Sequence, residues 1–161
     1  MKTAIIYKSI HHKNTEKVAG MIANVLNAEL LDPKDVNESI IARYDLVGFG
    51  SGIYFGNHHK SLLDIAERLP PAQNKKAFIF STSGMGRIPV FNKLNDKLKK
   101  ILMGKGFEIT GEFSCRGFDT YGVLKFIGGI RKGRPDERDL RNAAEFAKEL
   151  TENFYDIKNK F

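Results

Sequence analysis

The chain has 161 residues, a formal net charge of +7 and one cysteine, and this length fits a single domain over residues 1–161 with a sizeable core. The first apolar run ends at Lys8 and no later run approaches membrane-spanning length, so we expect neither a signal peptide nor a transmembrane helix. Because Cys115 has no second cysteine to pair with, the chain fits a reducing compartment, and we expect a cytoplasmic protein.

The predicted elements alternate between strands and helices along the chain. Short apolar runs predict strands at Thr3–Tyr7, Glu29–Leu31, Leu46–Gly50, Ala77–Ser81 and Phe107–Cys115. Helical patterns occur at Thr15–Asn27, Lys60–Arg68, Pro89–Met103 and Glu137–Asn153. Continuous apolar strands are typical of a parallel sheet with helices on both faces. The sequence therefore predicts an open α/β domain, whose ligands bind beyond the carboxyl ends of the strands.

The segment between the first predicted strand and helix is a candidate phosphate-binding loop. Backbone N–H groups at a helix start have no intrahelical acceptors, and the helix dipole favours an anion there. Ser9, Asn14 and Thr15 can add side-chain donors, while His11 and Lys13 can donate to a phosphate and attract it. The alternative interpretation is that Asn14 or Thr15 only caps the helix.

Two further loops, Ser51–His59 and Ser81–Arg87, follow predicted strands and should meet the first loop. The run Gly48-x-Gly50-x-Gly52 indicates close backbone approach to a planar ligand, and the aromatic residues Tyr54 and Phe55 could stack on it. The alternative for Tyr54 and Phe55 is ordinary packing, and the Ser/Thr/Gly cluster of the other loop is also plain turn chemistry.

The first loop resembles the Ser/Thr-x-Thr-x-x-Asn-Thr loop that wraps the phosphate of FMN in the flavodoxin-like family. Ser9, Asn14 and Thr15 match that pattern, whereas His11 stands where threonine is usual and Lys13 where glycine is common. The resemblance covers essentially the whole chain. It implies a flavodoxin-like three-layer fold, in which an open parallel sheet of five strands, in the order 2-1-3-4-5, has helices on both faces.

The resemblance also implies a non-covalent FMN site. Phosphate contacts would come from the first loop, and contacts to the flavin ring from the loops after the third and fourth strands. The positions carried over to the ring are Ser51, Gly52, Ile53, Tyr54, Phe55, Thr82, Ser83 and Gly84, with Gly117 and Phe118 approaching from beyond the fifth strand.

A redox protein that transfers electrons through FMN is therefore the first functional hypothesis, and it requires no catalytic side chain. The alternative is an FMN-dependent oxidoreductase acting on a quinone, a porphyrin precursor or another organic acceptor. Flavodoxin carriers are typically acidic, whereas this chain is basic. We therefore expect an acidic redox partner or acceptor. The basic and apolar loop 119–135 could dock an acidic partner, an anionic substrate or a membrane surface, although its apolar residues could instead pack over the sheet edge.

A binding module without flavin is the alternative from another class, with the basic surface holding nucleic acid, although no nucleic-acid-binding motif accompanies the charge. The histidine pairs His11-His12 and His58-His59 could capture a metal or deliver protons, the default being polar residues at helix starts. Cys115, at a predicted strand end, is more typical of a small buried residue than of a redox thiol.

Overall fold

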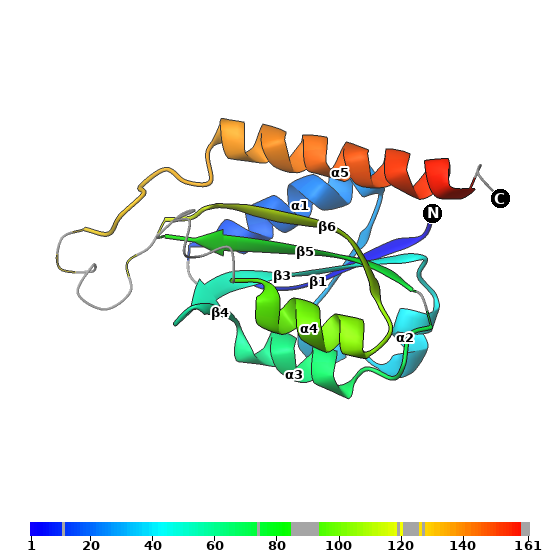
Figure 1. Cartoon of the computed structure of the whole chain (residues 1–161). Helices are drawn as coiled ribbons and strands as arrows, with labels where there is room; N and C mark the ends of the chain where they lie inside the picture. Colours follow the sequence, from blue (N-terminus) through cyan, green and yellow to red (C-terminus); the bar gives the residue numbers. More distant parts are fainter. Residues whose placement is uncertain are drawn as a thin grey trace.

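Strands and helices alternate along the chain as the sequence predicts (Figure 1). The computed structural model describes residues 1–10, 12–73, 75–84, 94–118, 120, 126 and 128–158. The strands are β1 (Thr3–Lys8), β2 (Glu29–Leu31), β3 (Leu46–Tyr54), β4 (Asn57–His58), β5 (Lys76–Ser83) and β6 (Glu108–Arg116). The helices are α1 (Asn14–Leu26), α2 (Glu38–Ala42), α3 (Lys60–Arg68), α4 (Asp96–Gly104) and α5 (Glu137–Lys158), with a 3₁₀ turn, η1, at Pro33–Asp35.

The main sheet is parallel and has the strand order β2-β1-β3-β5-β6, while β4 pairs with β3 in the antiparallel direction. Counting the five parallel strands alone, this is the predicted order 2-1-3-4-5. Helices α1 and α5 lie on one face and α3 and α4 on the other (Figure 1). The strand order reverses between β1 and β3, which places the expected ligand crevice at their carboxyl ends.

Strands β1, β3 and β5 each contribute to two cores, because their side chains alternate between the faces. On the side of α1 and α5, Ile5, Phe78 and Phe80 are fully buried. On the side of α3 and α4, Ile6 and Phe49 are fully buried. Burial on both faces explains why the strands read as continuous apolar runs.

Two glycines of β3 make room for this core. A Cβ atom on Gly48 would lie 2.3 Å from the ring of Phe78, and one on Gly50 would lie 2.1 Å from the ring of Phe80. The interpretation of these two glycines as a means of close approach to a ligand is therefore wrong. They are required because β5 places a phenylalanine ring over each of them.

The predicted loop Ser51–His59 is largely a hairpin. Strand β3 continues to Tyr54, and the turn residues Phe55 and Gly56 have φ of 49° and 78° before β4 returns. Positive φ at both central residues suits a two-residue hairpin turn, but Phe-Gly is not the usual Asn-Gly signal. The sequence pattern therefore did not reveal this hairpin.

Other boundaries differ modestly from the prediction. The five-residue α2 was not predicted, α4 begins at Asp96, and α5 continues to Lys158. The predicted start of α4 at Pro89 and part of the loop Ser81–Arg87 lie outside the described residues. In the part of the chain that the structure describes, no helix is both long enough and apolar enough to cross a membrane.

Candidate functional site

The predicted loops meet at the carboxyl edge of the sheet. Strand register aligns Lys8 of β1 with Ser51 of β3, Ser51 with Ser81 of β5, and Ser81 with Ser114 of β6. The segments that follow this row all leave the sheet on the same side, because the strands are parallel. The first loop, the β3–β4 hairpin and the end of β5 thus form one candidate site.

The first loop turns into α1 through two residues with left-handed backbone. His12 and Lys13 both have φ of 54°, and Lys13 is the N-cap residue of α1 without a side-chain capping bond. Lys13 stands where the resemblance expects glycine, which adopts this conformation without steric cost. Since no side chain caps it, the start of α1 keeps its backbone N–H groups for another acceptor.

Asn14 and Thr15 connect the first loop to neighbouring strands rather than capping the helix. The Asn14 Nδ2 atom donates to the carbonyl oxygen of Phe118 at 2.7 Å. The Thr15 and Thr82 hydroxyl oxygens are 2.9 Å apart, both in buried residues. The capping interpretation is therefore wrong for both side chains. They hold the phosphate-loop candidate against the ends of β5 and β6.

The first loop contains buried polar atoms without a partner. Among the described residues, the Ser9 hydroxyl and the Asn14 Oδ1 atom are buried and make no hydrogen bond. A buried hydroxyl without a partner costs about 1–3 kcal/mol, so such a group calls for an acceptor. A phosphate ester would satisfy the Ser9 hydroxyl. The donor set of this loop therefore fits an anionic group.

The charges around this loop are partly neutralised. Lys8 forms an ion pair with Asp32 at 3.0 Å, and the exposed Lys13 lies 3.4 Å from Glu16. The Lys13 pair is solvent-exposed and weak, so its ammonium can turn toward a ligand. The predicted contribution of His11 lies outside the described residues.

The hairpin presents two aromatic side chains in different environments. Tyr54 lies edge-on to the ring of His59, with 5.5 Å between ring centroids, and its hydroxyl lies 2.9 Å from where a Cβ atom on Gly52 would be. Phe55, at the turn, is 86% exposed. Ile53 pairs with His58 of β4. Tyr54 thus covers Gly52, and Phe55 is the more accessible aromatic surface.

The two residues that follow β6 contact the first loop. A Cβ atom on Gly117 would lie 2.8 Å from Asn14 Nδ2, and the ring centroids of Phe118 and His12 are 4.3 Å apart. The backbone N–H of Gly117 donates to the carbonyl of Ser83 at 3.0 Å. Gly117 and Phe118 therefore lie beside the phosphate-loop candidate, where glycine is needed because Asn14 is so close.

His58 is the site residue whose burial and hydrogen bonds the sequence does not predict. It is 3% exposed, and burial lowers the pKa of its imidazole to about 4. Its ring nitrogens lie 2.8 Å from the Ser51 hydroxyl and 2.9 Å from Asn95 Oδ1. By contrast, His59 follows the default expectation and caps α3, accepting from the backbone N–H of Ser61. Because His58 follows Gly56 and Asn57 rather than an apolar run, the sequence carries no signal of its burial.

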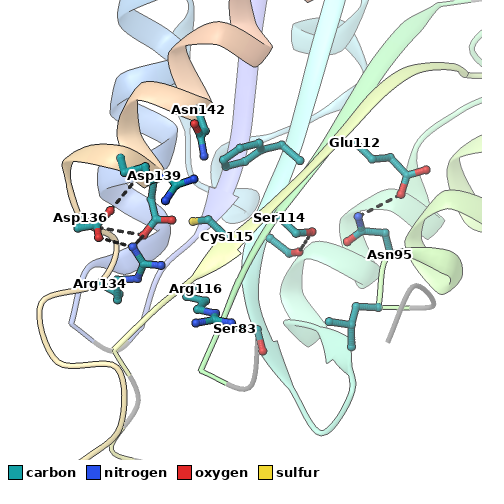
Figure 2. A pocket seen from close by; sticks show the side chains of 14 residues that line it. Ser83, Asn95, Glu112, Ser114, Cys115, Arg116, Arg134, Asp136, Asp139 and Asn142 are labelled. Atoms are coloured by element: carbon teal, nitrogen blue, oxygen red, sulfur yellow. Dashed lines mark hydrogen bonds and ion pairs between the residues drawn. The ribbon is translucent and has the colours of Figure 1, made fainter. Parts of the chain in front are cut away.

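A cavity of about 770 Å³ lies beside β6. Figure 2 shows polar groups on both sides of the strand, with Arg134 bound to Asp136 and Asp139 on one side and Asn95 directed at Glu112 on the other. Cys115 also lines the cavity, where burial and the Asp139 carboxylate raise the pKa of its thiol to about 12. Within the described ranges, no cluster of three or more histidine, cysteine or acidic residues could hold a metal ion.

Comparisons with known proteins give a family and a fold. The family model for a flavodoxin domain matches residues 4–123. An uncharacterized protein of Methanocaldococcus jannaschii is 53% identical over 155 residues, covering 95% of this chain and 100% of that protein. Oxidised Flavodoxin 2 from Bacillus cereus is 19% identical, with a TM-score of 0.70 over 95% of this chain and 99% of its own. A flavodoxin from Streptococcus pneumonia TIGR4 is 16% identical, with the same coverage and a TM-score of 0.71.

Proposed function

The chain belongs to the flavodoxin domain family, and on that premise we propose that it binds FMN non-covalently and transfers electrons. The observation that carries the proposal is the first loop. There the buried Ser9 hydroxyl has no partner among the described residues, and α1 begins without a side-chain cap. Both features suit a phosphate ester, because a dianion accepts hydrogen bonds from a hydroxyl and from the N–H groups of a helix start.

The parts of the site have separate roles in this proposal. Ser9 and the start of α1 hold the phosphate, and the Lys13 ammonium adds electrostatic attraction. The segments Ser51–Phe55 and Thr82–Gly84 orient the flavin ring at the carboxyl ends of β3 and β5. When bound, FMN supplies the electron or hydride chemistry, so no side chain has to act as a nucleophile.

We further propose that the electron donor or acceptor is acidic. Arg116, Arg131, Lys132 and Arg138 are exposed, and they lie around the loop that joins β6 to α5. In Figure 1 the segment 128–136 before α5 lies beyond the carboxyl edge of the sheet, which is the edge of the candidate site. Cationic side chains there would attract a partner of opposite charge. Either a protein or a small organic acceptor in the cytoplasm fits, since the single cysteine leads us to expect that location.

An FMN-dependent oxidoreductase is the second candidate function. The observation that favours it is the cavity of about 770 Å³ beside β6, whose wall includes Arg116 and Arg138. A cavity of this size accommodates a small organic molecule, and the guanidinium groups would suit an anionic one. Turnover of a quinone by the FMN-loaded protein, without a protein partner, would favour this role over that of a carrier.

The test is to titrate the apo protein with FMN and with riboflavin, which lacks the phosphate. We expect FMN to bind more tightly than riboflavin. Ser9→Ala should weaken FMN binding about tenfold or more, because it removes a hydrogen bond to a charged group, and should leave riboflavin binding unchanged. Ser39→Ala on α2 is the matched control, since Ser39 is exposed and its hydroxyl donates to the neighbouring Asn37 side chain, away from the candidate site.

Two outcomes would contradict the proposal. Equal affinities for FMN and riboflavin would remove the phosphate assignment at Ser9. If neither flavin bound, the redox function would be wrong, and the module that binds nucleic acid would become the leading hypothesis. That module predicts an affinity for nucleic acid that falls steeply with salt.

A further inference from the structure

A chain of hydrogen bonds runs from β3 to β6 on the face of the sheet that carries α3 and α4. The Ser51 Oγ and His58 Nδ1 atoms are 2.8 Å apart, and His58 Nε2 lies 2.9 Å from Asn95 Oδ1. Asn95 Nδ2 donates to Glu112 at 3.1 Å, as Figure 2 shows. At the outer end, Lys99 donates to the other Glu112 oxygen at 2.5 Å. Ser51, His58 and Asn95 are 0%, 3% and 7% exposed, so water cannot readily replace these bonds.

The chemistry of these groups fixes which atom donates in each of these hydrogen bonds. A carboxylate only accepts hydrogen bonds, so the side of Asn95 that faces Glu112 is its NH₂ group and the side that faces His58 is its oxygen. His58 must therefore carry a proton on Nε2. Because burial keeps this imidazole neutral at pH 7, its Nδ1 atom is unprotonated. The only proton available for the Ser51 bond is then the one on the Ser51 hydroxyl.

Ser51 has a second acceptor for that single proton. Its Oγ atom lies 2.7 Å from the carbonyl oxygen of Gly52 and accepts from the backbone N–H of His59 at 2.9 Å. While the Ser51 hydroxyl donates its hydrogen bond to His58 Nδ1, it cannot donate to the Gly52 carbonyl. If His58 became positively charged, Nδ1 would donate instead, and the hydroxyl proton would turn to the Gly52 carbonyl. The protonation of His58 thus decides how many donors this carbonyl has.

We propose that His58 and Asn95 are positioning residues that hold the Ser51 hydroxyl away from the Gly52 carbonyl, which leaves that carbonyl a stronger acceptor at the ring edge of the flavin site. The role assigned to Gly52 rests on the proposed function, whereas the direction of the hydrogen bonds does not. A stronger acceptor at this position favours whichever redox form of the flavin offers more N–H donors, so these buried residues tune the reduction potential.

The first measurement uses the apo protein and requires no flavin. Nitrogen-15 NMR of the histidine side chains, with His58→Gln to assign the signal, should show His58 protonated at Nε2 and unprotonated at Nδ1 at pH 7. The opposite tautomer, or a doubly protonated ring, would overturn the proposal. Because the unaltered chain is measured, this result does not depend on whether a variant folds.

The second measurement reverses the arrangement with Asn95→Asp. A carboxylate beside His58 Nε2 raises the pKa of the imidazole, so the ring should become doubly protonated at pH 7. In the FMN-loaded protein, the preference for reduced over oxidised FMN should then fall about threefold to tenfold, the effect of one hydrogen bond. Asn24→Asp on α1 is the charge-matched control, since Asn24 is exposed and α1 covers the opposite face of the sheet from α4 (Figure 1).

A double-mutant cycle separates this role from a merely structural one. If Asn95 acts through the Ser51 hydroxyl, Asn95→Asp should no longer shift the flavin preference in a Ser51→Ala background. An equal shift with and without Ser51 would overturn the proposed route. Failure of the unaltered chain to bind FMN would overturn the proposed function together with the role of Gly52, while the NMR result would still confirm or refute the hydrogen-bond direction.

Discussion

At the scale of single residues, His58 links the candidate site to the stability of the fold. Burial lowers the pKa of His58 from about 6.5 to about 4, with Asn95 and the more distant Glu112 opposing the shift. The unfolded chain therefore takes up a proton before the folded chain does. The free energy of unfolding should be highest above pH 6.5 and should fall by about 3 kcal/mol as the pH is lowered to 4.

Urea unfolding between pH 7 and pH 4 tests this prediction for His58. The groups facing the imidazole are Ser51 of β3, Asn95 before α4 and Glu112 of β6, which pairs with Lys99. His58→Gln should remove most of the dependence attributed to this residue, whereas other acidic groups titrate alike in both proteins. An identical pH dependence in the variant would show that the imidazole is not the group responsible.

Cys115 should be chemically inert in the folded protein. With the pKa of its thiol raised to about 12, the reactive thiolate is scarce near neutral pH. We expect alkylation by iodoacetamide at pH 8 to be on the order of 100-fold slower in the native protein than in urea. Mass spectrometry can follow the reaction without ambiguity, because the chain has one cysteine. Rapid native labelling would instead revive the redox-thiol hypothesis.

At the scale of elements, β3 and β5 fit together because glycines of β3 leave room for phenylalanine rings of β5. Gly50→Ala should lower the free energy of unfolding by about 2–3 kcal/mol, because the new methyl group overlaps the fully buried ring of Phe80. Gly20→Ala is the control, since it lies in α1 with nothing within 4 Å of its Cβ position. That change should stabilise the protein by about 0.5–1 kcal/mol.

Urea denaturation measures both glycine variants. If Gly50→Ala proved as harmless as Gly20→Ala, the ring of Phe80 would not occupy the space above β3, and the glycine could again be assigned to ligand approach. A double variant with Phe80→Leu should recover part of the loss, because the smaller side chain gives way to the methyl group.

At the scale of the whole molecule, the net charge of +7 should govern the choice of acceptor. After FMN loading and reduction, an anionic quinone sulfonate should reoxidise the protein faster than a neutral quinone at low salt. The difference should disappear at high salt, because the Debye length falls from about 30 Å at 0.01 M to about 3 Å at 1 M.

Reversing the charge of chosen side chains shows which surface attracts the anionic quinone. Arg131→Glu with Lys132→Glu should slow the reaction with the anionic quinone about tenfold or more at low salt. Arg43→Glu with Lys148→Glu is the matched control, because both residues are exposed but lie away from the β6–α5 loop. Equal slowing by both pairs would mean that only the total charge matters and that this loop is not the docking surface.

The sequence by itself determined the alternation of elements and the strand–loop–helix at Ser9–Thr15. These features depend on local periodicity and on burial of strands from both faces, which residue order records directly. The exact prediction of Lys60–Arg68 as a helix illustrates this. For the candidate site, the sequence predicts that the loops after β1, β3 and β5 meet, because parallel strands end at the same edge of the sheet.

Only the tertiary structure decided which of these residues contact one another. Strand register places Phe80 over Gly50. The packing of loops and helices places Gly117 against Asn14, and His58 beside Asn95, which is 37 positions away in the sequence. Contacts of this kind depend on how strands and helices pack across long stretches of chain, which a local pattern does not encode. For that reason the sequence pattern wrongly predicts Gly48 and Gly50 as ligand positions, and it does not predict the buried hydrogen bonds of His58.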